Sequence, residues 1–87
     1  MHTVDLLEQA LACAERLGYR ARQEWLGGQG GGVCEYSGQK WLFLDLAMNA
    51  SEQLEQVRLV LESDPAIFLA DLSPALNQWL DTGRRAA

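Results

Sequence analysis

The spacing of apolar residues predicts a helix at the start of the chain. Apolar side chains recur at intervals of three or four residues over residues 4–17, which places them on one face of a helix: Leu7, Ala10, Leu11, Ala14 and Leu17. Thr3 is positioned to cap the first turn. Gly18 follows the last apolar position, and glycine commonly ends a helix because it adopts the left-handed conformation without strain. We therefore expect a helix from about residue 4 to residue 17.

Three strands are predicted to follow. Residues 19–26 alternate between the two faces, residues 32–36 form a short second segment, and residues 40–47 are apolar on both faces. Ser37-Gly38 lies between the second and third segments and is typical of a tight hairpin turn. The third strand has two sets of side chains: Leu42, Leu44 and Leu46 on one face, Trp41 and Phe43 on the other.

The second half of the chain is predicted to be mainly helical. Asn49 and Glu52 have the spacing of a capping box, and an apolar stripe follows them: Leu54, Val57 and Leu61. Asp64-Pro65 and Ser73-Pro74 are each typical of an N-cap followed by the first helical residue. They predict a helical turn near residues 65–70 and a last helix from residue 74 to about 82, ending at Gly83, with residues 83–87 as a frayed tail.

Residues 66–69 also allow a different interpretation. Ile67 and Phe68 favour strands, so this segment could be a fourth strand. With the helical interpretation, the element order predicts a single α+β domain over residues 1–87. We expect an α-β-β-β-α arrangement with a three-stranded antiparallel sheet and a C-terminal helical extension.

Composition narrows the classes of partner. The chain has 87 residues, of which 48% are hydrophobic and 22% charged, with a formal net charge of −5. The seven basic residues are scattered, whereas a nucleic-acid-binding surface needs a basic stripe, so we expect no nucleic-acid partner. No apolar run has the length of a membrane span, and residues 1–5 lack the features of a signal peptide. We therefore expect a cytoplasmic protein without a membrane partner.

The inventory of reactive residues predicts no catalysis. The two cysteines, Cys13 and Cys34, are expected to be free thiols packed as small apolar groups. His2 is the one histidine, so the sequence offers no nucleophile with a neighbouring base and no set of metal ligands. We expect no catalytic residue, no metal and no cofactor, and hence a protein that is not an enzyme.

A glycine run provides one candidate binding site. Five of the six residues in Gly27–Gly32 are glycine, but the run lacks the spacing of phosphate-binding motifs and joins two strands instead of opening a helix. One interpretation is a hairpin loop or a bulged strand entry. Another is a flap over a small-ligand site, with these rim residues: Gly28, Gly30, Gly31, Arg22, Glu24 and Asp45. Asp45 is otherwise expected to pair with Arg20 or Arg22.

The aromatic side of the third strand is a second candidate site. Trp41 and Phe43 would form an apolar patch with charged surroundings, as protein-binding surfaces have, unless the C-terminal segment covers them. Leu76 and Trp79 on the last helix are alternative partner-binding residues. We expect a non-catalytic interaction or scaffold module that binds itself, as a homodimer, or another protein.

Three resemblances were found. The α-β-β-β-α order over residues 4–62 resembles the double-stranded-RNA-binding domain, but Ser51–Gln56 is acidic where that family has a basic cluster. The stretch from Arg22 to Leu46, with Glu52–Val57, resembles short uncharacterised bacterial proteins, which implies no activity. In size and charge the chain is similar to small acidic dimeric secretion chaperones, which implies a surface that holds partner proteins.

Overall fold

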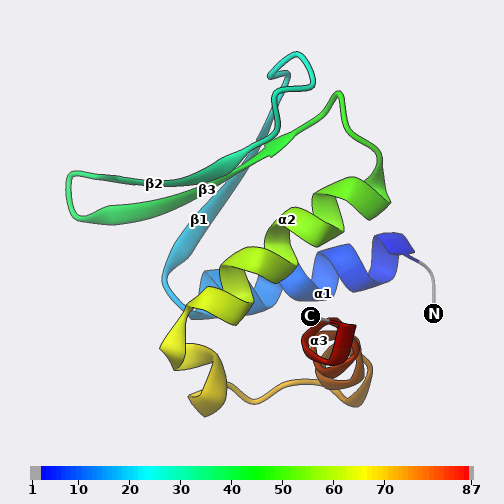
Figure 1. The fold of residues 1–87 in the computed structure, drawn as a ribbon. Coiled ribbons are helices and arrows are strands. Elements are labelled where there is room, and N and C mark those ends of the chain that lie inside the picture. Colours follow the sequence, from blue (N-terminus) through cyan, green and yellow to red (C-terminus); the bar gives the residue numbers. More distant parts are fainter. Residues whose placement is uncertain (1–2, 87) are drawn as a thin grey trace.

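The chain forms three layers: a sheet, a pair of helices beneath it, and a third helix beneath the pair (Figure 1). The computed structural model describes residues 3–86, with side chains through residue 82. The elements are, in order, α1 (Thr3–Arg16), β1 (Tyr19–Glu24), β2 (Gly32–Tyr36), β3 (Gln39–Asp45), α2 (Ala50–Ser63), the 3-10 helix η1 (Pro65–Leu69) and α3 (Pro74–Ala86). The α+β class is therefore confirmed.

The sheet is mixed, so the prediction of an antiparallel sheet is wrong. Its strand order is β1-β3-β2. β2 pairs antiparallel with β3, but β1 runs parallel to β3, with Tyr19 opposite Lys40 and Glu24 opposite Asp45. The glycine run does not join neighbouring strands. It carries the chain across the end of β3 to the far edge of the sheet, which is why the hairpin interpretation of this loop is also wrong.

Local sequence signals produce the expected helix ends and hairpin. Gly18 has a φ of 101° and ends α1. The capping box of α2 is present: the amide of Glu52 donates to Asn49 Oδ1 at 2.8 Å, and the amide of Asn49 donates to Glu52 Oε1 at 3.0 Å. Ser37 and Gly38 both have positive φ, 51° and 77°, as the turn between β2 and β3 requires.

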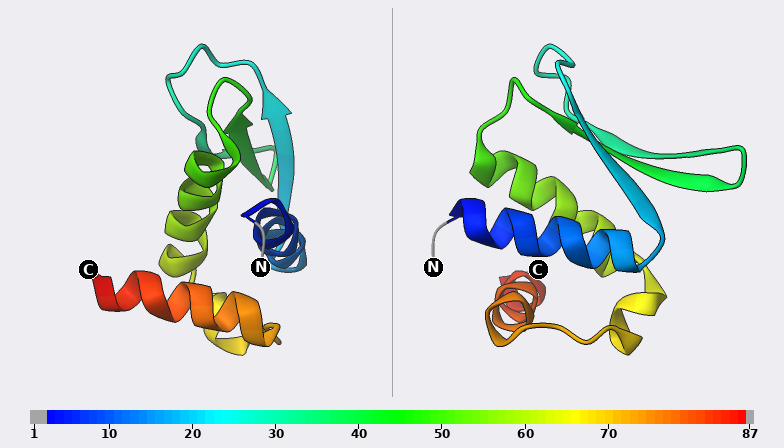
Figure 2. Two further views of the ribbon diagram at one scale, coloured as in Figure 1. Left: turned by 90° about the vertical axis from the view of Figure 1, so that its right-hand side faces the viewer. Right: turned by 180° about the vertical axis from the view of Figure 1, so that it is seen from behind.

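The core lies between the sheet and the helices. Leu42 and Leu44 of β3 are fully buried, as predicted, and belong to one buried cluster with side chains from all three helices: Leu7, Ala10, Cys13, Ala14, Leu54, Val57, Leu61, Leu76, Trp79 and Leu80. Figure 2 shows α3 crossing the helix pair on the side away from the sheet. The C-terminal segment therefore does not cover the face with Trp41 and Phe43, and that alternative is wrong.

The C-terminal segment is helical, as the N-cap signals predict. Asp64 Oδ1 accepts from the amide of Ala66 at 2.9 Å at the start of η1, so residues 66–69 are not a strand. Ser73 Oγ accepts from the amide of Leu76 at 3.2 Å and caps α3. The helix continues through Gly83 to Ala86, so the predicted end at Gly83 is wrong, while the frayed tail over 83–87 stays a prediction. One interior glycine costs about 1 kcal/mol, which a helix anchored by tertiary packing tolerates.

The two cysteines differ in environment. Both are free thiols, and Cys13 is buried in the core as expected. Cys34 is exposed, because it lies on β2 at the edge of the sheet. The expectation that it packs as an apolar group is wrong. His2 lies outside the part of the chain that the structure describes.

Candidate functional site

One face of the sheet lies against the helices, and the other is open. Residues directly opposite each other in neighbouring strands point to the same side. The register therefore places the following side chains on the side away from the helices, which we call the open face: Arg20, Arg22, Glu24, Cys34, Tyr36, Gln39, Trp41 and Phe43. No other element within residues 3–86 covers it. Trp41 and Phe43 share one face of β3, as predicted. Their neighbours on that face are Arg20, Arg22, Cys34 and Tyr36.

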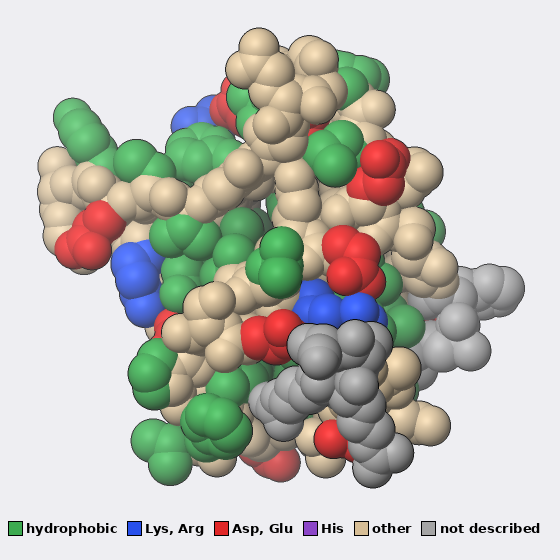
Figure 3. Space-filling model, in the orientation of Figure 1, with side chains coloured by type: hydrophobic (Ala, Val, Ile, Leu, Met, Phe, Trp, Pro, Cys, Tyr) green, Lys and Arg blue, Asp and Glu red, His purple; other side chains and the backbone are tan. Residues whose placement is uncertain are grey.

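Aromatic rings dominate the open face. The rings of Trp41 and Phe43 are stacked with their centroids 6.2 Å apart, and the guanidinium of Arg20 lies 5.8 Å from the Trp41 centroid. Both rings are half-buried, whereas Tyr36 is 71% exposed. A hollow of about 390 Å³ lies among five of these side chains: Arg22, Cys34, Tyr36, Trp41 and Phe43. Figure 3 shows hydrophobic side chains gathered along the hairpin at the upper left of the molecule.

Asp45 anchors the loop between β1 and β2. Its side chain is fully buried at the end of β3. Oδ1 accepts from the amides of Leu26, at 3.1 Å, and Ala47, at 2.9 Å, while Oδ2 accepts from the amide of Gly30 at 3.1 Å. The expected pairing with Arg20 or Arg22 is wrong, since Arg22 pairs with Glu24 at 2.9 Å. Backbone amides satisfy this carboxylate in place of a cation.

These amides also determine the charge of Asp45. Burial raises the pKa of its carboxyl, but hydrogen bonds from the amides of Ala47, Leu26, Gly30 and Gly28 favour the charged form and together outweigh burial. The pKa is therefore below its ordinary value. Asp45 is an anion at neutral pH, and its charge holds the loop closed over the end of β3.

The anchored loop explains most of the glycine run. Gly27, Gly28 and Gly30 have positive φ, between 71° and 81°, a conformation that side chains disfavour. A Cβ on Gly31 would lie 1.6 Å from the carbonyl oxygen of Phe43, so the loop crosses β3 in direct contact with its backbone. Gly32 has no positive φ, and a Cβ built on it would contact no other atom. Gly28 and Gly30, predicted to lie at the rim of a ligand site, instead direct their amides to Asp45.

The alternative partner-binding residues on α3 are used inside the protein. Leu76 is 1% exposed and Trp79 is 8% exposed. The guanidinium of Arg58, on α2, lies 4.7 Å from the Trp79 ring centroid. Leu76 and Trp79 hold α3 against α1 and α2, so these two side chains offer little surface to a partner.

A polar cluster that the sequence reasoning missed joins β1, β3 and the start of η1. The Tyr19 hydroxyl donates to Asp64 Oδ2 at 2.9 Å, and Lys40 Nζ lies 3.5 Å from the same oxygen. Lys40 Nζ also lies 4.3 Å from the Tyr19 ring centroid. Asp64 was recognised as an N-cap, but its partner Tyr19 is 45 residues away. No local signal could have linked them.

The pKa shifts in this cluster favour a structural role. Burial and the hydrogen bond to Asp64 raise the pKa of Tyr19. The amide of Ala66 and the Tyr19 hydroxyl lower the pKa of Asp64. Tyrosine therefore stays protonated and aspartate charged, the states in which the hydrogen bond between them forms.

Comparisons with protein-family models, with curated proteins and with solved structures found no match, so the geometry carries the functional argument. Within the described residues, no three His, Cys, Asp or Glu side chains group as metal ligands. None of the helices over residues 3–86 has the length and apolar character needed to cross a bilayer. The open face remains the candidate site with the most distinctive chemistry.

Proposed function

We propose that this protein is a non-catalytic interaction module that self-associates through the open face of its sheet. One observation carries the proposal: Trp41, Phe43 and Tyr36 surround a hollow on a sheet face that no described element covers. Aromatic residues and arginine are enriched in the cores of protein interfaces, where they supply most of the binding energy. Arg20 and Arg22 border the aromatic rings in the arrangement that such interfaces use.

The open face favours a protein partner over a small ligand. The hollow is bordered by side chains of β1, β2 and β3 and has no covering element, whereas small-ligand sites enclose most of the ligand's surface. The glycine loop, which a ligand-binding flap would need to move, is fixed by Asp45 and by the contact of Gly31 with β3. A chaperone-like role, in which the same face holds a different protein, would use the same residues.

Replacing Trp41 by lysine tests the proposal. A lysine at the centre of the open face would bring a third positive charge beside Arg20 and Arg22 and remove the largest ring. We expect size-exclusion chromatography with light scattering to give, for the wild type, a mass above the 9.7 kDa monomer that falls on dilution. The Trp41→Lys variant should remain at the monomer mass with an unchanged circular dichroism spectrum.

Leu69→Lys is the matched control. Leu69 is 90% exposed on η1, on the helical side of the molecule, so the same kind of substitution there should leave association unchanged. A wild-type chain that is monomeric at every concentration would refute self-association. Equal association of the Trp41→Lys variant and the wild type would exclude the open face.

A further inference from the structure

The two edges of the sheet differ in how well they are protected against further pairing. β1 and β2 are both edge strands. β1 carries Arg20, Arg22 and Glu24, and charged residues discourage strand addition. β2 has the sequence Gly-Val-Cys-Glu-Tyr, all five residues are exposed, and Glu35 is its one charged residue, against three in β1. Its outer edge is therefore open to another strand.

The hairpin turn determines which backbone groups of β2 face outward. In a hairpin with a two-residue loop, the residues next to the loop form a hydrogen-bonded pair, here Tyr36 and Gln39. Hydrogen-bonded and non-hydrogen-bonded pairs then alternate along the ladder. Cys34 therefore directs its backbone groups toward β3, while Val33 and Glu35 direct theirs away from the sheet.

We propose that this outer edge pairs antiparallel with β2 of a second copy. The register in which all five residues overlap places Cys34 opposite the partner's Cys34, and Val33 opposite the partner's Glu35. Val33 and Glu35 then form the hydrogen-bonded pairs, as their outward groups require. The Cys34 pair at the centre is non-hydrogen-bonded, with Cα atoms about 4.5 Å apart. The backbone pattern and the fullest overlap thus select the same register.

Side chains fit this register as well. Tyr36, which is 71% exposed, would lie opposite the partner's Gly32. A Cβ built on Gly32 meets nothing within 4 Å, and Gly32 is the one glycine of the run that the monomer does not require. An aromatic side chain packed over a cross-strand glycine is a stabilising pair in sheets. Gly32 pairs with Phe43 of β3, so the ring of the partner's Tyr36 would lie beside Phe43 and extend the aromatic cluster of the open face.

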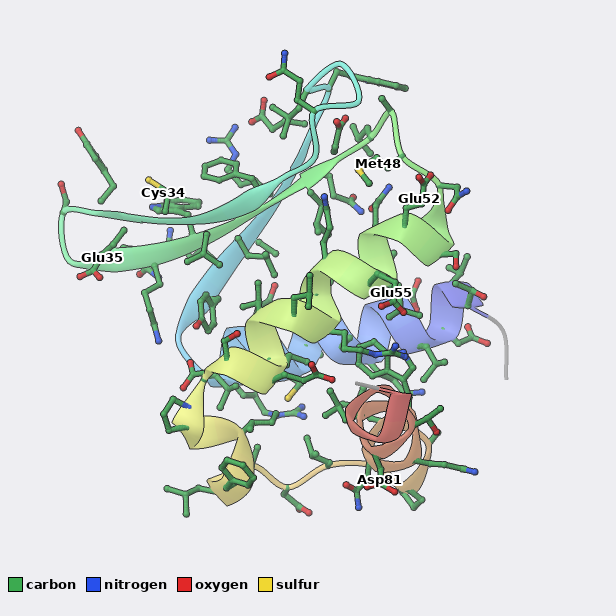
Figure 4. The ribbon with its side chains drawn as sticks, viewed as in Figure 1. Cys34, Glu35, Met48, Glu52, Glu55 and Asp81 are labelled. Atoms are coloured by element: carbon green, nitrogen blue, oxygen red, sulfur yellow. The ribbon has the colours of Figure 1, made fainter. Side chains whose placement is uncertain are left out.

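The charges also suit a second copy. Figure 4 shows Cys34 and Glu35 on opposite sides of β2, so Glu35 points away from the open face. In the proposed register Glu35 faces an apolar side chain, Val33 of the partner. A register centred on Glu35 would place two carboxylates opposite each other, which destabilises a strand pair. This inference rests on the proposed self-association and adds a second contact to the one through the open face: two sheets joined edge to edge through β2, with their open faces side by side.

Oxidation with diamide tests the geometry in the native chain. Two thiols lose two hydrogens to diamide and form one disulfide, and the distance between paired Cys34 residues suits that bond. Pairing raises the effective thiol concentration from micromolar to about millimolar, so we expect cross-linking roughly 1,000-fold faster than in urea-unfolded chain. The Cys34→Ser variant, which keeps only the buried Cys13, should give no cross-linked dimer.

Single cysteines at neighbouring positions test the register. In a Cys34→Ser background, Val33→Cys and Glu35→Cys should each cross-link poorly alone, because identical positions are diagonal and about 7–8 Å apart. An equimolar mixture of the two should cross-link as a heterodimer. Glu35→Pro removes an outward amide without touching the β3 ladder, so it should fold and remain monomeric.

The outcomes separate this inference from the proposed function. If the chain associates but Cys34 cross-links no faster than in the unfolded chain, the β2 pairing is refuted, and the Trp41→Lys variant then decides whether association runs through the open face. If Val33→Cys cross-links with itself and the mixture does not, the register is wrong. A chain that is monomeric at all concentrations refutes both proposals.

Discussion

Replacing Gly31 by alanine tests whether the glycine run is a structural device that lets the chain cross β3. The new Cβ would lie 1.6 Å from the carbonyl oxygen of Phe43 and 2.5 Å from its carbonyl carbon. Both are backbone atoms of the central strand, which cannot swing aside as a flexible side chain does. Because ordinary contact begins at 3.4 Å, the loop must move by roughly 2 Å.

The energetic cost follows from that displacement. Overpacking of this kind costs about 1–3 kcal/mol. The movement would also break the hydrogen bond of the Gly30 amide, now 3.1 Å long, at a further cost of about 1 kcal/mol. We therefore expect the free energy of unfolding to fall by roughly 2–4 kcal/mol, a large share of the stability of so small a domain. Urea unfolding followed by tryptophan fluorescence, at a concentration where the chain is monomeric, measures this change.

Two further glycines provide graded controls. Gly32→Ala meets no atom and needs no unusual backbone, so its free energy of unfolding should change by less than about 0.5 kcal/mol. Gly28→Ala meets no atom but has a φ of 81°, so it should cost about 1 kcal/mol through backbone strain alone. Equal stability of the Gly31 and Gly32 variants would refute the close crossing of the loop over β3.

Two other predictions concern the buried polar groups. Because the pKa of Asp45 is lowered in the folded state, its contribution is fully present above the unfolded value of about 3.9 and is lost as the pH falls through the lower folded value. Asp45→Asn should lower Tm at pH 7 and flatten the loss of Tm below pH 4, and an unchanged acid profile would contradict the assignment. Tyr19→Phe removes the hydrogen bond to Asp64 and should lower the free energy of unfolding in urea by about 1 kcal/mol. An unchanged free energy of unfolding would mean that this hydrogen bond does not form in solution.

The sequence predicted the elements whose signals are local. Gly18, the Asn49–Glu52 capping box and the Ser37-Gly38 turn each act within four residues, and each forms as expected. The helical stripes of α1 and α2 likewise identified the buried Leu7, Ala14, Val57 and Leu61.

The strand order was not predictable in this way. The parallel pairing of β1 with β3 depends on Asp45 binding amides of a loop that precedes it by 15 to 19 residues, and on the passage of Gly31 over Phe43. The side chains of β1 alternate between the two faces of the sheet whichever strand it pairs with, so this alternation does not reveal its neighbour. The aromatic pair of the open face was found because Trp41 and Phe43 share a parity on one strand, whereas Arg20, Cys34 and Tyr36 joined it only through the register.

The crossing of the glycine loop over β3 has a consequence for the order of folding. The β2–β3 hairpin closes around a two-residue turn, whereas every β1–β3 pair joins residues much farther apart in the chain. Contacts between nearby residues form sooner, because closing a short loop loses less chain entropy. We therefore expect the hairpin to form first and β1 to add to the free edge of β3 afterwards. The glycine loop, which links β1 to β2 across the end of β3, then takes its final path last.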